Sequence, residues 1–446
     1  MKNQNMLRYT IEPQDVHKTI GKYMLADGFE MVFDLHKSNG IYCHDAKTGR
    51  DFLDMFTFFA SSPIGFNHPK LTSPEMIRFL GEVAVNNITN SDLYTTEMAS
   101  FVETFFQLAV PAGFKHAFFI AGGALGIENA LKAAFDWKVR KNFARYYPLE
   151  VGQRVISFTH AFHGRTGYTL SLTRTEPTKF QYYPMFEWPK AISPAIQFPL
   201  NEENLAAVKK LEDKALDQVK QAFLEYPDDI AAIIIETIQG EGGDRHFRTE
   251  FLRALKEIAD EEDAMLIFDE VQCGMGLTGK MWAFQHHNVM PDMFCFGKKS
   301  QVCGFVANEK IDSVEKNVFH ESSRINSTWG GNLIDMVRVT KYLEIMDEEK
   351  LVDHAAIMGD LLLKNLVEFQ KTHTQLISNA RGRGLMCAFD LPNGDLRNKF
   401  RSKLYENGLA ILGCGDKTIR FRPPLNITEE NISEAMRILY KTAKEM

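Results

Sequence analysis

The sequence has neither a long apolar run nor a strong positive charge, and each absence narrows the possible functions. No apolar run approaches the roughly 18 residues of a membrane-spanning helix, and residues 1–8 lack the apolar core of a secretory signal. The formal net charge of −7 disfavours nucleic acid as a partner. We therefore expect small-molecule chemistry without membrane or nucleic-acid binding.

Cysteine is also scarce: six residues are scattered along the chain, and no two form a CxxC pair. This spacing argues against a zinc site, so we expect no metal. It favours reduced thiols, as in cytoplasmic proteins. A chain of 446 residues is too long for one simple core and suggests two or three domains. The sequence thus predicts a cytoplasmic enzyme of several domains.

The middle of the chain alternates short β-rich runs with helical patterns, which predicts an α/β fold with a largely parallel sheet covered by helices. The expected strands are His116–Ile120, Arg154–Phe158, Ala231–Glu236, Ala264–Phe268 and Asp292–Phe296. Helical patterns cover residues 126–142, 201–221, 250–262 and 332–349.

The two ends of the chain differ from the middle. A hairpin is expected within residues 35–51, and long helices, short strands and a final helix follow residue 331. We expect an N-terminal segment (1–66) that contributes to a small domain. A large α/β domain (67–331) and a C-terminal small α+β domain (332–446) would follow it.

Polar side chains follow two neighbouring apolar runs of the expected sheet. Asp269 comes directly after one run, and Lys298 follows the next run and a glycine. A pyridoxal-phosphate (PLP) site needs an amine for its Schiff base and an anion for its pyridinium nitrogen. A lysine desolvated at a strand end is also suited to moving protons. The pair therefore suits PLP, although Asp269 and Glu270 alone would equally cap the next segment.

An ATPase is the competing interpretation, with residues 266–270 as the magnesium-binding strand and 297–300 as the phosphate loop. Such a loop requires a glycine five residues before its Gly-Lys pair and a Ser or Thr after the lysine. Here those positions hold Asp292 and Lys299, and the order of the two motifs is reversed. The ATPase interpretation is therefore weak. The sequence alone does not choose between Lys298 and Lys299, one of which would ordinarily be a solvated surface charge.

Two further segments could hold a phosphate. The glycine-rich stretch at residues 121–128 joins a strand to a helix, where free backbone N–H groups attract anions. A tight structural turn explains the same glycines equally well. The stretch Ser327–Asn332 could add a hydroxyl donor.

The stretch Phe162-His-Gly-Arg165 combines an aromatic ring with a cation. Phe162 could stack on a pyridine ring, and His163 is more simply explained as a hydrogen-bonded structural histidine. Arg165 and Arg420 are suited to bidentate capture of carboxylates. Glu241, which lies between glycines, could neutralise one of these arginines.

Taken together, these motifs resemble the class III PLP-dependent aminotransferases along nearly the whole chain. The resemblance implies PLP fold type I. Within the family, the sequence is most similar to the lysine ε-aminotransferase subgroup, particularly at residues 122–134, 297–304 and 381–389. The six motifs, in order, are Phe162–Arg165, Glu236–Glu241, Phe268–Gln272, Pro291-Asp with Gly297-Lys298, Ser327–Asn332 and Arg420–Leu425.

The resemblance implies a role for each cofactor-binding residue. Lys298 would bond covalently to PLP, and Asp269 would face the pyridine nitrogen. Gln272 would lie near the ring oxygen, and Phe162 would stack on the ring face. Lys298 and Asp269 would be the catalytic pair.

The resemblance also implies how the phosphate is bound. Backbone groups of Gly123 and Ala124 would hold it, and Thr328 would reach it from the other subunit of a homodimer. The wider family has a Ser-Gly-Ser/Thr turn at this place, so the hydroxyl contacts are lost here. This departure, like those at Thr237 and at Ser300–Gly304, is toward the lysine-specific subgroup.

The implied activity is ping-pong transfer of the ε-amino group of L-lysine to 2-oxoglutarate. We expect Glu241 to pair with Arg420 while lysine reacts and to move aside for 2-oxoglutarate. Arg165 would hold the distal carboxylate of both substrates. The alternatives are an ω-transaminase for ornithine, 4-aminobutyrate or another diamine, or a PLP-dependent racemase or mutase.

Overall fold

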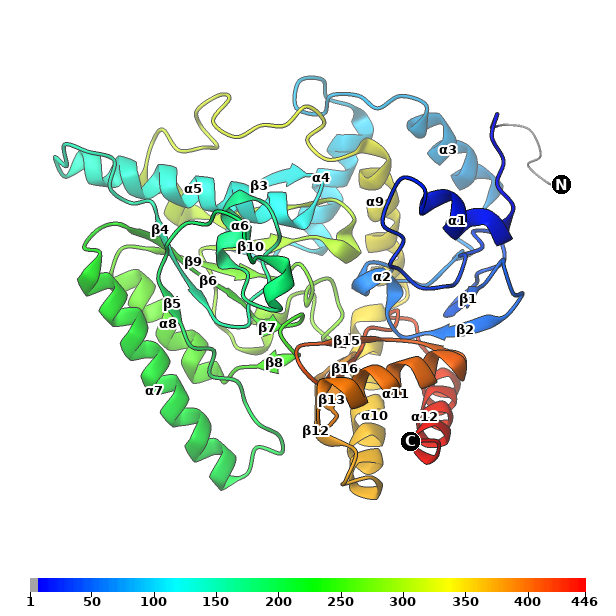
Figure 1. Cartoon of the computed structure of the whole chain (residues 1–446). Coiled ribbons are helices and arrows are strands. Elements are labelled where there is room, and N and C mark those ends of the chain that lie inside the picture. Colours follow the sequence, from blue (N-terminus) through cyan, green and yellow to red (C-terminus); the bar gives the residue numbers. More distant parts are fainter. Residues whose placement is uncertain (1–6) are drawn as a thin grey trace.

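The computed structural model describes residues 7–446, and its main feature is a seven-stranded sheet covered by helices on both faces (Figure 1). The expectation that no secretory signal is present lies mostly outside the described residues. The strand order is β3-β11-β10-β9-β6-β4-β5. The bounds are β3 Phe114–Ile120, β4 Arg154–Phe158, β5 Lys190–Ala191, β6 Ile230–Glu236, β9 Met265–Asp269, β10 Met293–Phe296 and β11 Cys303–Asn308.

The expected α/β fold and all five expected strands are confirmed. Five neighbouring strands of this sheet run parallel, in the order β10-β9-β6-β4-β5. β6 is buried over its whole length, which is typical of a parallel strand covered on both faces. β11 was not expected, and it runs antiparallel to both β10 and β3. A short connection joins β10 to β11, so the chain reverses direction and β11 lies directly beside β10. β3 is then the edge strand of the sheet.

Helices pack against the two faces of this sheet. α5 covers one face, and α7 and α8 lie on the other (Figure 1). α8 shows why such segments fold as helices: its apolar residues recur at helical spacing and are buried, while the opposite stripe is charged. The helices in residues 57–261 are α2 Thr57–Ala60, α3 Pro74–Ala84, α4 Thr96–Leu108, α5 Gly123–Ala144, α6 Gly167–Leu172, α7 Glu202–Glu225 and α8 Thr249–Glu261.

A second, antiparallel sheet forms the C-terminal part, in the order β12-β13-β16-β15. The helices around it are α9 Leu333–Glu348, α10 Leu351–Thr372, α11 Gly394–Glu406 and α12 Glu429–Lys444. Thr428 caps α12 with a reciprocal capping box, as the sequence indicates. The strands are β12 Ser378–Arg383, β13 Met386–Asp390, β15 Leu412–Cys414 and β16 Thr418–Phe421.

The N-terminal part contributes α1 (Val16–Ile20) and the expected hairpin, β1 (Tyr42–His44) and β2 (Asp51–Asp54). β2 also pairs in parallel with β14 (Leu409–Ala410), so one small sheet joins the two ends of the chain. A short ribbon of β7 and β8, at residues 238–239 and 245–246, borders the main sheet. None of the helices in residues 7–446 has the length and apolar character that crossing a bilayer requires.

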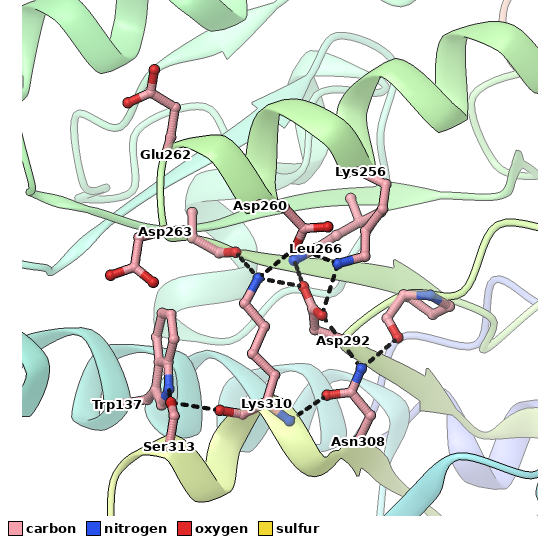
Figure 2. Close-up of polar contacts among 12 residues, drawn as sticks. Trp137, Lys256, Asp260, Glu262, Asp263, Leu266, Asp292, Asn308, Lys310 and Ser313 are labelled. Atoms are coloured by element: carbon pink, nitrogen blue, oxygen red, sulfur yellow. Dashed lines mark hydrogen bonds and ion pairs between the residues drawn. The ribbon is translucent and has the colours of Figure 1, made fainter.

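A polar network holds together the residues at which β9 and β10 begin (Figure 2). Lys310 Nζ donates to the Ala264 carbonyl at 2.8 Å and to Asp292 at 3.2 Å. Asp292 also accepts from the backbone of Leu266 at 2.8 Å and from Lys256 at 3.0 Å. Two lysines therefore offset the desolvation of this buried carboxylate.

Candidate active site

Two carboxylates lie side by side at the carboxyl ends of β6 and β9, where open α/β sheets bind ligands. Glu236 and Asp269 are paired in the sheet register, and both are buried. Glu236 accepts backbone hydrogen bonds from Phe162 at 2.8 Å and Gly240 at 3.1 Å. Burial raises the pKa of Glu236 to about 7. No role was expected for Glu236 from the sequence, yet it holds the loop that presents Phe162.

Asp269 is itself held from two sides. Its Oδ2 lies 2.7 Å from His163 Nδ1, and its Oδ1 accepts from the Val271 backbone at 3.0 Å. His163 is buried, and its Nε2 has no hydrogen-bond partner among residues 7–446. The hydrogen bond expected of His163 is therefore present, and its structural role stays a prediction.

The two adjacent lysines have different surroundings. Lys299 is 2% exposed and donates to the Gln272 carbonyl at 3.0 Å, so it is not the solvated charge that a lysine pair suggests. Lys298 follows Gly297 in a left-handed conformation (φ +53°) and is only partly buried. Burial, reinforced by the charge of Arg420, lowers the pKa of Lys298 to about 8. Its amine is therefore easily freed of its proton.

Glu241 lies between two cations. Its Oε2 is 2.8 Å from Arg420 Nη1, and its Oε1 is 2.6 Å from Lys179 Nζ. Burial opposes ionisation, but Arg420 and Lys179 outweigh it and lower the pKa of Glu241 to about 2. Lys179 was not expected here, because nothing in its local sequence pattern indicates that its turn lies beside Glu241. Its amine is also 5.2 Å from the centroid of the Phe162 ring.

Gln272 completes this arginine-rich wall. Its Oε1 accepts from Arg422 Nη2 at 2.9 Å and lies 3.4 Å from Arg420 Nη1. Arg422 is in turn fixed by the buried carboxylate of Asp244 at 2.5 and 2.9 Å. A side chain at Gly240 would place its Cβ 2.2 Å from Gln272 Oε1, so this close approach requires glycine.

The glycine-rich stretch forms the start of α5, as expected. Its N-cap is Gly122 (φ +107°), which has no side chain to cap the first-turn N–H groups. A Cβ at Gly164 would lie 2.5 Å from Ala124 Cβ, and one at Gly123 would lie 2.9 Å from Val271. The helix start thus packs tightly between the segment after Phe162 and the residues after Asp269.

Residues 23–443 match the family described as Aminotransferase class-III. The chain belongs to this family. It is 48% identical over 425 residues to the L-lysine-epsilon aminotransferase of Mycobacterium tuberculosis (strain ATCC 25618 / H37Rv), which covers 95% of this chain and 94% of that protein. It is 44% identical over 431 residues to the same-named protein of Streptomyces clavuligerus, with 96% and 94% covered.

Solved structures agree with this assignment. The lysine aminotransferase from M. tuberculosis in the internal aldimine form superimposes with a TM-score of 0.95 at 47% identity, covering 97% of this chain and 99% of that one. The expected PLP fold type I is confirmed. This class-III aminotransferase is therefore a PLP-dependent enzyme that acts on small molecules.

The side chains of this aminotransferase fit PLP. A lysine with a lowered pKa, a buried carboxylate held by His163 and an uncapped helix start are brought together by the sheet, because β9 and β10 are neighbours and a Cβ at Gly297 would lie 3.5 Å from Gly123 Cα. These groups match the three needs of the cofactor: an amine to bond, an anion for the ring nitrogen and donors for the phosphate.

Two of the expected residues, unlike those above, are exposed in the single chain. Arg165 is exposed, with its guanidinium 6.0 Å from the Phe162 ring centroid, and it lines a pocket of about 380 Å³ together with Lys179. Thr328 is exposed, and its backbone carbonyl accepts from Ser91 at 3.3 Å. The hydrogen bonds of Thr328 among residues 7–446 include none to Lys298.

A strained turn borders the arginine wall. All four residues of α2, Thr57–Ala60, have positive φ angles between +42° and +67°. A left-handed turn of non-glycine residues costs about 1–2 kcal/mol per residue. Thr57 Oγ1 anchors it by donating to the Arg422 carbonyl at 2.6 Å. The turn presents the half-exposed ring of Phe59 to Arg420, 6.0 Å away.

Proposed function

We propose that this aminotransferase transfers the ε-amino group of L-lysine to 2-oxoglutarate in a ping-pong reaction. The products are L-glutamate and 2-aminoadipate 6-semialdehyde, which cyclises to a piperideine carboxylate. Relatives at 44% and 48% identity are named L-lysine-epsilon aminotransferase. The observation that carries the proposal in this chain is the ion pair between Glu241 and Arg420.

This ion pair addresses the problem of two unlike substrates in one pocket. L-Lysine has no carboxylate next to its reacting carbon, whereas 2-oxoglutarate has one. Glu241 neutralises Arg420 while lysine is bound, because a buried cation that loses its partner costs about 3–5 kcal/mol. When 2-oxoglutarate brings its own carboxylate, Glu241 moves aside and Arg420 binds the substrate. Arg165 holds the distal carboxylate of either substrate.

Lys179 gives Glu241 a second partner for this movement. Each carboxylate oxygen of Glu241 has its own cation, so the contact to Lys179 need not break when the contact to Arg420 does. Lys179 also pairs with Glu176 at 2.5 Å, which keeps its amine in place. Glu241 therefore remains paired in both half-reactions.

The cofactor residues have the following roles. Bound PLP supplies an aldehyde for covalent attachment and an electron-withdrawing ring. Lys298 would hold the cofactor through Nζ and would carry the proton to and from the reacting carbon. Asp269 keeps the ring nitrogen protonated, and His163 orients Asp269. Phe162 covers the ring face, and Gln272 lies near the ring oxygen.

The phosphate is held by backbone N–H groups of Gly123 and Ala124 at the start of α5. Thr328 of a second chain completes the site, so the active unit is a homodimer with its active sites at the subunit interface. The exposure of Thr328 supports this assembly. The scattered cysteines, all free and buried, support a cytoplasmic location.

The domain division belongs to the same proposal. Residues 67–331 form the large PLP-binding domain, and residues 332–446 form the small one. The strands of the main sheet, within residues 114–308, support this boundary. Pairing of β2 with β14 supports the contribution of residues 1–66 to the small domain.

The test is a Glu241→Gln variant studied by single-turnover absorbance, one half-reaction at a time. We expect the lysine half-reaction to slow by at least about tenfold, since the variant leaves Arg420 unpaired. The 2-oxoglutarate half-reaction should keep its rate. Glu176→Gln is the matched control, because Glu176 pairs with Lys179 but not with Arg420. Equal losses in both half-reactions would show that the switch is wrong.

The substrate itself is tested with L-lysine labelled with ¹⁵N at the ε-amine. The label should appear in glutamate. Label retained on the lysine-derived product would exclude terminal transfer. Higher activity with ornithine or 4-aminobutyrate than with lysine would favour the alternative ω-transaminases, and turnover without an added keto acid would favour a racemase or mutase.

A further inference from the structure

Three side chains able to bind a metal lie together beside β3, the edge strand of the main sheet. They are His116 on β3, Asp312 in the 3₁₀ helix η5 (Glu309–Ser313) and His320 in the turns after it. Their candidate ligand atoms all lie within 4.8 Å of one another. We propose that these three residues bind one divalent transition-metal ion of the Zn²⁺ type.

The separations between these atoms suit such an ion. His116 Nε2 lies 2.9 Å from Asp312 Oδ1, and His320 Nε2 lies 3.8 Å from the same oxygen. Tetrahedral zinc with bonds of about 2.0–2.1 Å places its ligand atoms roughly 3.3 Å apart. The two measured separations fall on either side of this value. Small side-chain rotations, together with loss of the proton that His116 Nε2 donates to Asp312, therefore form the site.

One tautomer of His320 suits metal binding. Its Nδ1 lies 3.0 Å from the backbone carbonyl of Glu315, which only accepts, and 3.4 Å from Asn317 Nδ2, which only donates, so the shorter contact favours a proton on Nδ1. In the neutral ring, Nε2 then presents a lone pair toward Asp312. At 3.8 Å this contact is too long for a hydrogen bond. Two facing lone pairs repel each other, and a cation between them removes the repulsion. Metal-bound histidines commonly donate their other ring N–H in this way.

The other two side chains are also oriented before any ion binds. The His116 ring stacks on Phe319, with centroids 4.7 Å apart and planes at 16°. Asp312 lies in η5, which is anchored to the sheet by the Lys310 contacts and to α5 by Ser313, whose hydroxyl accepts from Trp137 at 2.9 Å (Figure 2). Little ordering is therefore left for the ion to impose.

The ligand set indicates which ions fit. Two imidazoles and one carboxylate favour zinc, nickel or cobalt over magnesium and calcium, which prefer oxygen ligands. Three protein ligands leave a position for water. Bound metal would link residues 312–320 to β3. It would thereby restrict the movement of the following segment, which ends at the motif Ser327–Asn332. The six scattered cysteines could not reveal this site, because it is made of histidine and aspartate from distant positions.

The test is Zn²⁺ binding by the holoenzyme after chelator treatment and gel filtration, followed by calorimetry and metal analysis. We expect one ion per chain at this site and a higher thermal midpoint with Zn²⁺ than without. His116→Gln and His320→Gln should each weaken binding at least about tenfold and abolish the thermal shift. His36→Gln, at an exposed histidine elsewhere, is the matched control and should bind as the parent does.

A second arm separates metal binding from a simple ion pair. Asp312→Asn keeps the shape and a hydrogen bond to His116 but weakens ligation, so Zn²⁺ binding should fall while the fold is kept. Equal binding by the parent and the three site variants would overturn the proposal, as would an absence of Zn²⁺ binding. Equal affinity for Mg²⁺ and Zn²⁺ would overturn it as well.

Discussion

Asp269 Oδ2 lies 2.7 Å from His163 Nδ1, and both side chains are buried. The position of Asp269, the carboxylate proposed to face the cofactor nitrogen, thus depends on His163. His163 itself has no proposed contact with the cofactor. Loss of a hydrogen bond to a buried charged group costs about 1.5–3 kcal/mol. His163 is therefore expected to act as a positioning residue.

We predict that His163→Leu weakens PLP retention about tenfold or more, because Asp269 loses its orienting donor. His163→Asn, whose amide can donate to the same oxygen, should recover part of the loss. Equilibrium dialysis with absorbance detection measures the dissociation constant. A His163→Leu enzyme that retains PLP as the parent does would contradict the prediction.

Lys179 offers a sharper test of the two-substrate switch. Lys179→Met leaves Arg420 as the main partner of Glu241, so Glu241 should leave Arg420 less readily. We predict that the 2-oxoglutarate half-reaction slows by about tenfold, as for a lost charged hydrogen bond. The lysine half-reaction should change little, and Lys179→Arg should restore both. A loss confined to the lysine half-reaction would reverse the proposed role.

The lowered pKa of Lys298 predicts how the apoenzyme takes up PLP. Only the neutral amine attacks the aldehyde, so uptake is slow below pH 8 and rises as pH increases through about 8. A lysine with the ordinary pKa of 10.5 would require a correspondingly higher pH. Absorbance-monitored uptake rates across this range give the midpoint. Arg420→Met removes a charge that lowers the pKa, so its midpoint should move to higher pH. A parent midpoint near 10.5 would refute the assignment.

We predict opposite effects for substitution of alanine at two glycines, Gly81 and Gly240. Gly81→Ala, at an exposed position inside α3 with free space around it, should raise the free energy of unfolding by about 0.5–1 kcal/mol. Gly240→Ala places a methyl group against Gln272 and should lower both PLP retention and activity. Thermal midpoints and PLP absorbance measure the two effects. A destabilised Gly81→Ala variant would contradict the first prediction.

Much of the main sheet was predictable because its parallel strands are short apolar runs that end in polar residues. Asp269 and Lys298 could be singled out by this logic, and the ordered motifs added Phe162, Glu241 and Arg420. The direction of β11 was not predictable, because local sequence does not determine which neighbour a strand pairs with. Long-range contacts decide that.

The remaining site features depend on packing between distant segments. Lys179 becomes relevant only when its turn lies over Phe162, and Glu236 only when its carboxylate meets the backbone of that loop. Lys299 looked like a surface residue, because its burial depends on the position of the Gln272 carbonyl. In each case the sequence shows the residue type, and the fold supplies its partner.

The parallel pairing of β2 with β14 has a consequence for synthesis on the ribosome. β2 is synthesised early, but β14, its other neighbour in the sheet besides β1, is synthesised only after almost the whole chain has been translated. The apolar residues around Phe52 and Phe56 must therefore wait, uncovered, while the main sheet can already assemble. We expect this part of the nascent chain to be the portion that chaperones protect longest.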